Sequence, residues 1–436
     1  MLRQGPVVTD VLTLPAEEPL HRFEHQPVAG YDYDTCGPAT FRRIVLTNGK
    51  VGIPGGPQYH LISLAHNGTV TLARMQKLRD LVKAGANLLG EPPVATPGLH
   101  EAARADAELR TISNEIWGTE NESERPLGSS RVFRGVSAEE ALRRLQVTAD
   151  FTGPKDISWI HRSHAEADVY FIASSTDQAR TESYTFRVTG KRAELWNPEN
   201  GEIQPLSSSP AGPHHTQATL TLSPKGSTFV VFHSGTPVTD SAVARSEEST
   251  REIKGPWTVV FPKEGAAARS FRIDPLVSWS AHPDPDVRHF SGTAVYTNQF
   301  EISDLRSQMT LDLGKVEIMA RVKLNGQDLD ILWKPPYQVD ISKVAVQRKN
   351  QLEISVVNLW VNRLIGDAAL PEDSDRDKNG TLVSWPRWVL DGKSSPTGRK
   401  SFVTFQLWKK DEPLRNSGLL VPVRLSSTTR QTSRTD

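Results

Sequence analysis

The chain has 436 residues, with 51 basic and 51 acidic side chains and a formal net charge of zero. This length suits about three domains of ordinary size, each with its own hydrophobic core. Zero net charge argues against nucleic acid or an anionic membrane as a partner. The single cysteine, Cys36, excludes internal disulfides, multi-cysteine zinc sites and iron–sulfur clusters, and we expect its thiol to be inert.

The N-terminal segment carries acidic residues and prolines where a secretory signal needs an apolar core, so no export signal is visible and the localisation stays open. No run of about 18 apolar residues occurs, which argues against a membrane-spanning helix. The apolar run Pro6–Leu14 predicts a β-strand. It has no partner strand nearby in the sequence, although a lone strand must pair with something.

Residues 35–147 predict a small open α/β domain of the flavodoxin or amidotransferase type. An apolar strand at Tyr59–Leu64 precedes an amphipathic helical stripe over 72–82, which ends at Gly85, a residue suited to a left-handed helix cap. A second strand at Ala86–Gly90 completes a βαβ unit with parallel strands.

Two more helices are predicted in this domain, one over 105–116 and one that begins at the capping box Ser137-Ala-Glu-Glu140. The turn after the first strand has a single glycine, so it lacks the glycine set that cradles phosphates in nucleotide-binding domains. We therefore do not expect a nucleotide site or any other cofactor in this chain.

From residue 148 the pattern changes to the period of two that is typical of β-strands, and nine of the ten tryptophans lie beyond residue 150. The pattern predicts a β-sandwich over 148–235 with a hairpin at Asn200-Gly201. A linker is expected over 236–256 and a jelly-roll sandwich over 257–425, whose last strand is Phe402–Trp408. The tail, 426–436, is expected to be disordered.

Two groups of residues have the composition of a polar or metal site. His161 and Arg162 follow an apolar strand and precede Glu166 and Asp168, which suits either a functional site or a hydrogen-bonded strand end. The second group resembles the start of a calcium loop with alternating oxygen ligands, but its twelfth position holds Pro386 rather than glutamate, so a solvated acidic loop is the alternative. The calcium candidates in that loop are Asp373, Asp375 and Asp377.

A third group combines tryptophans with amide, guanidinium and carboxylate side chains. Tryptophan rings stack on the apolar faces of sugars, while the polar groups hydrogen-bond sugar hydroxyls. The alternative is that the tryptophans fill a core and that Arg363 pairs with Asp367 on the surface. The carbohydrate candidates in this group are Trp333, Trp360, Asn362, Arg363 and Asp367.

Four motifs of the last predicted domain resemble the sugar-binding-type jelly roll of glycoside hydrolase family 106, the α-L-rhamnosidases, which has relatives in the family 2 β-galactosidases. These motifs are Phe290–Tyr296, Leu311–Gly326, Leu332–Ile341 and Asn358–Asp367. Upstream segments also find counterparts in order: Arg3–Leu12, Tyr59–Leu64, Ile160–Arg162 and Ala167–Ile172. The resemblance covers nearly the whole chain and predicts a galactose-binding-like fold for the last domain.

The resemblance also implies a catalytic (β/α)-barrel that precedes these domains and carries an acid and a base carboxylate. We expect residues 1–34 to be a remnant of that barrel, so that this chain lacks the catalytic pair. Glu17 falls where the family strand ends in an aromatic-Gly-Glu pattern, but Pro15 and Ala16 replace the aromatic residue and the glycine. Family enzymes are usually exported, and a calcium ion is possible in the full-length enzymes.

Three hypotheses follow for the function. The chain is the C-terminal part of an α-L-rhamnosidase-like enzyme acting on rhamnose-containing glycans, a carbohydrate-binding or scaffold protein without catalysis, or one half of an enzyme that reassembles with a separately encoded barrel. If the domains pack against a barrel rim, Asp32, Asp34, His161 and Arg162 could reach a sugar, as could Asn362, Arg363 and Asp367. Each of these residues could instead form an interdomain salt bridge.

Overall fold

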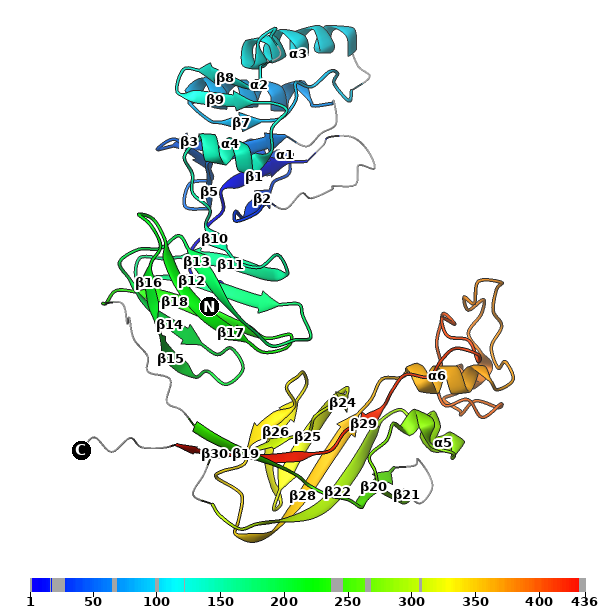
Figure 1. Ribbon diagram of the computed structural model, residues 1–436. Helices are drawn as coiled ribbons and strands as arrows, with labels where there is room; N and C mark the ends of the chain where they lie inside the picture. The colour runs from blue at the N-terminus through cyan, green and yellow to red at the C-terminus, as the bar shows by residue number, and fades with distance from the viewer. Residues whose placement is uncertain are drawn as a thin grey trace, which may run out of the picture. The chain divides into compact units, whose positions relative to one another are not determined.

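The computed structural model describes residues 2–15, 17, 28–64, 69–98, 102–120, 122–236, 246–262, 268–305 and 308–430. The chain forms two structural units, residues 1–241 and 242–436. Figure 1 shows an α/β part and a β-rich part in the first unit, and a mostly β architecture in the second. The chain is thus multidomain, with α/β and all-β parts, as the sequence predicts.

The first part of unit 1 is built on a six-stranded sheet in the order β2-β1-β6-β7-β9-β8, in which only β8 is antiparallel to its neighbour. The segment between β2 and β6 forms a small antiparallel sheet, β3-β4-β5. The strands are β1 (Val11–Leu14), β2 (Tyr33–Thr35), β3 (Val45–Thr47), β4 (Lys50–Gly52), β5 (Gln58–Tyr59), β6 (Leu61–Leu64), β7 (Leu88–Leu89), β8 (Glu124–Leu127) and β9 (Ser130–Phe133). The helices are α1 (Pro38–Phe41), α2 (Leu72–Ala84), α3 (Ala102–Trp117) and α4 (Ala138–Arg144).

Local capping signals place α2 and α4 where the sequence predicts them. Helix α2 ends at Gly85, which has φ 118° and whose backbone N–H caps the last turn. Helix α4 begins at Ser137, whose side chain accepts a hydrogen bond from the Glu140 N–H. The buried face of α2, which includes Leu78 and Val82, packs in one core with Leu12 and Ile62 of the sheet. The predicted parallel βαβ unit, β6-α2-β7, is present.

The predicted opening strand, Pro6–Leu14, is divided between two sheets. Residues 6–8 hydrogen-bond along the edge of the following sandwich, where the Val8 N–H donates to the His161 carbonyl at 2.9 Å. Residues 11–14 form β1, which is held between β2 and β6. The strand therefore has partners within this chain, in β2, β6 and β11. The assignment of residues 1–34 to a preceding barrel stays a prediction. Residues 1, 16 and 18–27 lie outside the described residues.

The second part of unit 1 is a sandwich of a four-stranded sheet, β10-β13-β17-β16, and a five-stranded sheet, β11-β12-β18-β14-β15. The predicted hairpin around Asn200-Gly201 joins β14 to β15. Aromatic side chains from both sheets, among them Tyr170, Phe186 and Phe232, fill the core. The strands are β10 (Phe151–Thr152), β11 (Ile157–Ser163), β12 (Ala167–Ser174), β13 (Arg180–Phe186), β14 (Arg192–Trp196), β15 (Ile203–Leu206), β16 (Ser208–Pro210), β17 (Thr216–Leu222) and β18 (Ser227–His233).

Unit 2 packs a six-stranded antiparallel sheet, β21-β20-β22-β28-β25-β26, against a four-stranded sheet, β19-β30-β23-β27. Trp257 and Tyr296 from the first sheet share one core with Leu311 and Leu425 from the second. The strands are β19 (Ser246–Glu252), β20 (Trp257–Phe261), β21 (Arg269–Ile273), β22 (Thr293–Ile302), β23 (Gln308–Asp312), β24 (Val316–Glu317), β25 (Met319–Leu324), β26 (Gln327–Leu332), β27 (Gln338–Asp340), β28 (Arg348–Val357), β29 (Gly418–Leu419) and β30 (Arg424–Arg430). The helices are η1 (Trp279–Ala281), α5 (Pro285–Arg288), α6 (Val361–Ala368) and α7 (Arg387–Leu390).

Three predictions for unit 2 need correction. The predicted linker, 236–256, contains β19, and the predicted disordered tail, 426–436, contains most of β30. These two strands pair with each other, and β30 also pairs with β23. Leu425 of β30 is buried in the core of unit 2, which gives this segment an ordered place in the fold. Residues 237–245 and 431–436 lie outside the described residues. The predicted strand Phe402–Trp408 is a loop with one isolated bridge, between Phe405 and Thr381.

Candidate functional site

His161 lies at the centre of a buried charge cluster in unit 1. Its Nδ1 is 2.9 Å from Oδ2 of Asp150 and its Nε2 is 3.1 Å from Oδ1 of Asp168. The imidazole ring also stacks on the Tyr170 ring with centroids 4.0 Å apart, and the Tyr170 hydroxyl donates to Asp150 at 2.8 Å. Both ring nitrogens face carboxylates, so the protonated ring, which donates at both positions, fits this geometry best.

The cluster continues on both sides of His161. Lys191 contacts Asp168 at 2.6 Å, while the Arg187 guanidinium lies 3.4 Å from Asp150 and donates to both oxygens of Asp10 at 3.1 Å. Charges therefore alternate along the row Lys191, Asp168, His161, Asp150, Arg187 and Asp10. We call these six residues the charge row.

The backbone explains why residues so distant in sequence meet here. Asp10 lies between residues 6–8, which pair with β11 of the sandwich, and residues 11–14, which form β1 of the α/β sheet. Its carboxylate therefore lies where these two parts of unit 1 meet. His161 and Asp168 come from the two strands of the β11-β12 hairpin. The charge row thus joins the two parts of unit 1, and the ion pair between Arg187 and Asp10 crosses the joint.

A cleft of ≈ 870 Å³ opens beside the charge row. Asp10, His161 and Arg187 line it together with Lys50 and His60. Burial, together with the nearby charges of Lys50 and Arg187, lowers the pKa of His60 to about 4, so its imidazole is neutral at pH 7. This cleft offers both hydrogen-bond donors and acceptors, but the Arg187 guanidinium and the Asp10 carboxylate that line it are already paired with each other.

We expect the charge row to stabilise unit 1 in a pH-dependent way. Burial alone would lower the pKa of His161, but the hydrogen bonds to Asp150 and Asp168 outweigh burial and the net pKa is raised. A raised histidine pKa contributes stability that is complete below the unfolded value of ~6.5 and is lost as the pH rises through the folded pKa. The difference in unfolding free energy between wild type and His161→Gln should therefore be largest near pH 6 and shrink toward pH 9.

This difference is measured by denaturant unfolding of both proteins across that pH range. His60, which is neutral when folded and becomes charged when unfolded at low pH, affects both proteins alike, so the subtraction removes it. A difference that stays constant or grows between pH 6 and pH 9 would contradict an imidazolium at position 161.

The remaining predicted residues of unit 1 lie around this joint. The Asp34 carboxylate accepts a hydrogen bond from the Tyr59 hydroxyl at 2.8 Å. Burial, together with the nearby carboxylates of Asp34, Asp150 and Asp10, raises the pKa of Asp32 to about 6, so Asp32 could exchange a proton near neutral pH. The cleft, however, is lined by Asp10 and not by Asp32.

Arg162 and Glu17 serve local structure. Arg162 donates to the Gly5 carbonyl at 3.1 Å and so holds the N-terminal segment on β11. Glu17 lies 3.3 Å from the Arg74 guanidinium and accepts a hydrogen bond at 2.7 Å from the backbone N–H of Thr71, the N-cap of α2. Both side chains of the Glu17–Arg74 pair are nearly inaccessible to solvent, so the Glu17 carboxylate is engaged in fixing the start of α2.

In unit 2 the predicted carbohydrate residues divide into buried and exposed groups. Asn362 exchanges two hydrogen bonds of 2.7 Å with the Arg415 backbone, and Asp367 accepts three from Lys400 and Ser401. Both side chains are buried and fix loops. Burial lowers the pKa of Arg363, which lies in the field of Asp367. The exposed members of the group are Trp333 and Trp360, at 61% and 59% exposure.

The three calcium candidates do not fit a calcium loop. Asp373 accepts hydrogen bonds from Ser374 and Ser395, Asp377 accepts two from the backbone of its own turn, and Asp375 is exposed. In the described part of the chain, no group of three or more His, Cys, Asp or Glu side chains is arranged to hold a metal ion. Cys36 is buried, and burial raises the pKa of its thiol to about 11.

Sequence reasoning found His161 and Asp168 but missed their partners. Asp168 follows His161 by seven residues in one hairpin, whereas Arg187 and Asp10 are 177 positions apart. The available signal for Asp10 was a lone acidic residue in an apolar run. For Asp150 and Arg187 a single sequence carries no comparable signal, because their pairing depends on how the two parts pack.

Comparison with known proteins shows that the chain is similar to glycosidases. Residues 1–209 match the family model of the α-L-rhamnosidases of glycoside hydrolase family 106. The solved structure of a rhamnosidase from Novosphingobium sp. PP1Y is 30% identical and superposes with a TM-score of 0.74, over 98% of this chain and 39% of its own. The chain is a glycoside-hydrolase-like protein. Among these proteins it resembles the α-L-rhamnosidases.

A curated relative from Formosa agariphila bears the name "Putative beta-glucuronidase". It is 24% identical over an alignment of 659 positions, gaps included, which covers 98% of this chain and 56% of the relative. The glycosidase-like chain thus spans less than two thirds of both relatives. No helix in the ranges that the structure describes is long and apolar enough to cross a membrane.

Proposed function

We propose that this chain is the accessory, C-terminal part of a glycoside hydrolase that releases terminal α-L-rhamnose from glycans when joined to a catalytic barrel. The observation that carries the proposal is the rhamnosidase match, at a TM-score of 0.74 over 98% of this chain but 39% of the solved enzyme. Hydrolysis with inversion requires an acid and a base carboxylate ~6.5–9.5 Å apart across the sugar. The one carboxylate that family position suggested, Glu17, is engaged by Arg74.

Within this proposal the chain has three domains, for which the sequence predicts the ranges 35–147, 148–235 and 257–425. Strands β19 and β30 extend the last of them to 246–430. We assign the first to the flavodoxin or amidotransferase type and the last to the galactose-binding-like jelly rolls. The two-sheet packing of unit 2 around one core supports the second assignment. The charge row would fix the first two domains to each other so that they present one surface to the barrel.

A domain exchange tests the proposal. The part of the Novosphingobium rhamnosidase that matches this chain is replaced by this chain, and hydrolysis of an aryl α-L-rhamnoside is measured. We expect the exchanged enzyme to keep activity and the isolated chain to show none. A folded exchange protein without activity would contradict the accessory role. Turnover by the isolated chain that survives purification would contradict the absence of the catalytic pair.

The alternative function is carbohydrate binding without catalysis. It is favoured by one specific observation, a group of exposed aromatic side chains on unit 2 that includes Trp360, Trp385 and Phe405. Aromatic rings exposed to water are costly unless a ligand or partner covers them, and they are the usual platforms for sugars.

A further inference from the structure

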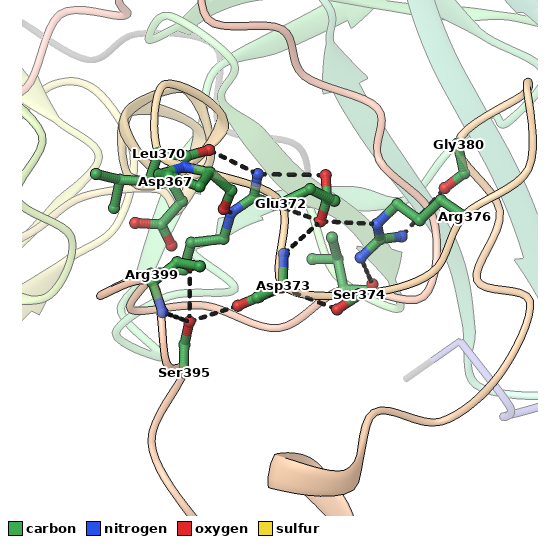
Figure 2. Close-up of polar contacts among 12 residues, drawn as sticks. Asp367, Leu370, Glu372, Asp373, Ser374, Arg376, Gly380, Ser395 and Arg399 are labelled. Atoms are coloured by element: carbon green, nitrogen blue, oxygen red, sulfur yellow. Dashed lines mark hydrogen bonds and ion pairs between the residues drawn. The ribbon is translucent and has the colours of Figure 1, made fainter.

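Residues 358–417 form a long excursion between β28 and β29 that contains little regular structure apart from α6 and α7. Its order comes from polar side chains that bind the loop backbone. Arg399 donates to both oxygens of Glu372 and to the carbonyls of Leu370 and Pro371, all at 3.0–3.2 Å. Figure 2 shows Arg376 on the other side of the same glutamate, with its guanidinium directed at the Gly380 carbonyl. Long ordered loops of this kind are usually functional.

A cavity of ≈ 290 Å³ lies within the excursion. Its apolar lining includes the rings of Phe402, Phe405 and Trp408. Its polar lining includes Ser401, Gln406 and the Asp373 carboxylate. The volume is at the small end of ligand cavities, which begin at ~300 Å³, and suits one sugar ring rather than an oligosaccharide.

The charges around the cavity determine what it can bind. The side chains of Arg376 and Arg399 line it and are less than a tenth exposed, but their charge is shared with Glu372 and their donors are directed at loop carbonyls. The Arg376 Nε makes no hydrogen bond although it is buried. The lining thus offers little free positive charge to an anion, but provides an apolar face and several hydrogen-bonding groups, which is the combination that a neutral sugar requires.

We propose that this cavity binds a single neutral pyranose, with Phe405 against the apolar face of the ring and with Gln406 and Ser401 at its hydroxyls. The choice of a sugar as the ligand class rests on the proposed function, whereas the site rests on the cavity itself. The predicted strand Phe402–Trp408 is not a strand in the structure, and its aromatic residues, which recur every third position, line this cavity instead of a sheet face.

Saturation-transfer NMR on the full chain tests the proposal, with L-rhamnose, D-galactose and D-glucuronate as probes. We expect transfer to at least one neutral sugar, weak transfer to glucuronate, and a Kd in the millimolar range for so small a ligand. Phe405→Ala should weaken binding about tenfold, since one aromatic contact is lost. Because Phe405 is 51% exposed, this variant should fold normally. Gln406→Ala, which removes one of the proposed hydroxyl partners, should weaken binding as well.

Leu390→Ala is the matched control, since Leu390 lies in the same excursion, is 65% exposed and does not line the cavity. It should leave binding unchanged. No transfer to either neutral sugar, equal binding by wild type and Phe405→Ala, or preference for glucuronate would each overturn the proposal. An inactive domain exchange together with binding that depends on Phe405 would refute the accessory role and leave this site standing.

Discussion

Replacing Asp150 by alanine is expected to lower the free energy of unfolding of unit 1 by about 3–5 kcal/mol. The Asp150 side chain is fully buried and contacts His161, Arg187 and the Tyr170 hydroxyl. Its removal leaves the buried His161 and the partly buried Arg187 without the carboxylate between them. Removing one partner of a buried ion pair costs more than the net contribution of the intact pair, because the other charge stays buried and unpaired. Asp150→Asn keeps the shape but removes the charge, so it should cause a smaller loss of the same sign.

Hydrogen exchange measured by mass spectrometry locates the effect. Peptides from β11 and β12 should exchange faster in both variants, while those from the sheets of unit 2 provide an internal reference. Glu182→Ala, a change at an exposed acidic residue of β13, should alter neither the free energy of unfolding nor the exchange of these peptides. If Asp150→Ala destabilises unit 1 no more than Glu182→Ala does, the charge row contributes nothing to the joint.

Local sequence signals predicted the elements but not their neighbours. The glycine cap at Gly85 and the capping box at Ser137 depend on residues within one turn of the chain, and both helix ends were predicted. The strand Pro6–Leu14 was also predicted, yet its partners are β2, β6 and β11, some twenty, fifty and 150 positions away. Which strand pairs with which depends on packing of the whole unit, and that information is not local.

The candidate residues illustrate the same limit. Asn362 and Asp367 were chosen because amide and carboxylate groups bind sugars, but in the structure they bind the loop backbone at Arg415, Lys400 and Ser401. The same residue types satisfy a long irregular loop and a sugar, since both present hydroxyl and amide groups. The apolar segment that contains Phe402 and Phe405 was predicted to be a strand, although these two rings are three positions apart and would lie on opposite faces of a strand. In the structure both line the cavity of the excursion, which the local sequence does not indicate.

Replacing Asp367 by alanine is expected to destabilise unit 2 by about 2–4 kcal/mol, because a single carboxylate oxygen accepts the Lys400 N–H, the Ser401 N–H and the Ser401 hydroxyl at 2.6–2.9 Å. The Asp367 side chain is 4% exposed, so water cannot easily replace the lost acceptor. The loss should be concentrated in the excursion, where backbone N–H groups around residue 400 would exchange much faster in hydrogen-exchange measurements. Sugar binding should weaken as well, since Asp367 and Ser401 both line the cavity.

Asp411→Ala is the matched control, because Asp411 is an exposed aspartate of the same excursion. It should change neither stability nor sugar binding. If Asp367→Ala unfolds at the same denaturant concentration as Asp411→Ala, the three hydrogen bonds do not hold the excursion together, and the cavity would owe its shape to the Glu372, Arg376 and Arg399 cluster alone. A parallel loss of order and of binding in Asp367→Ala, with both retained in Asp411→Ala, would tie the order of the loop to the site that it forms.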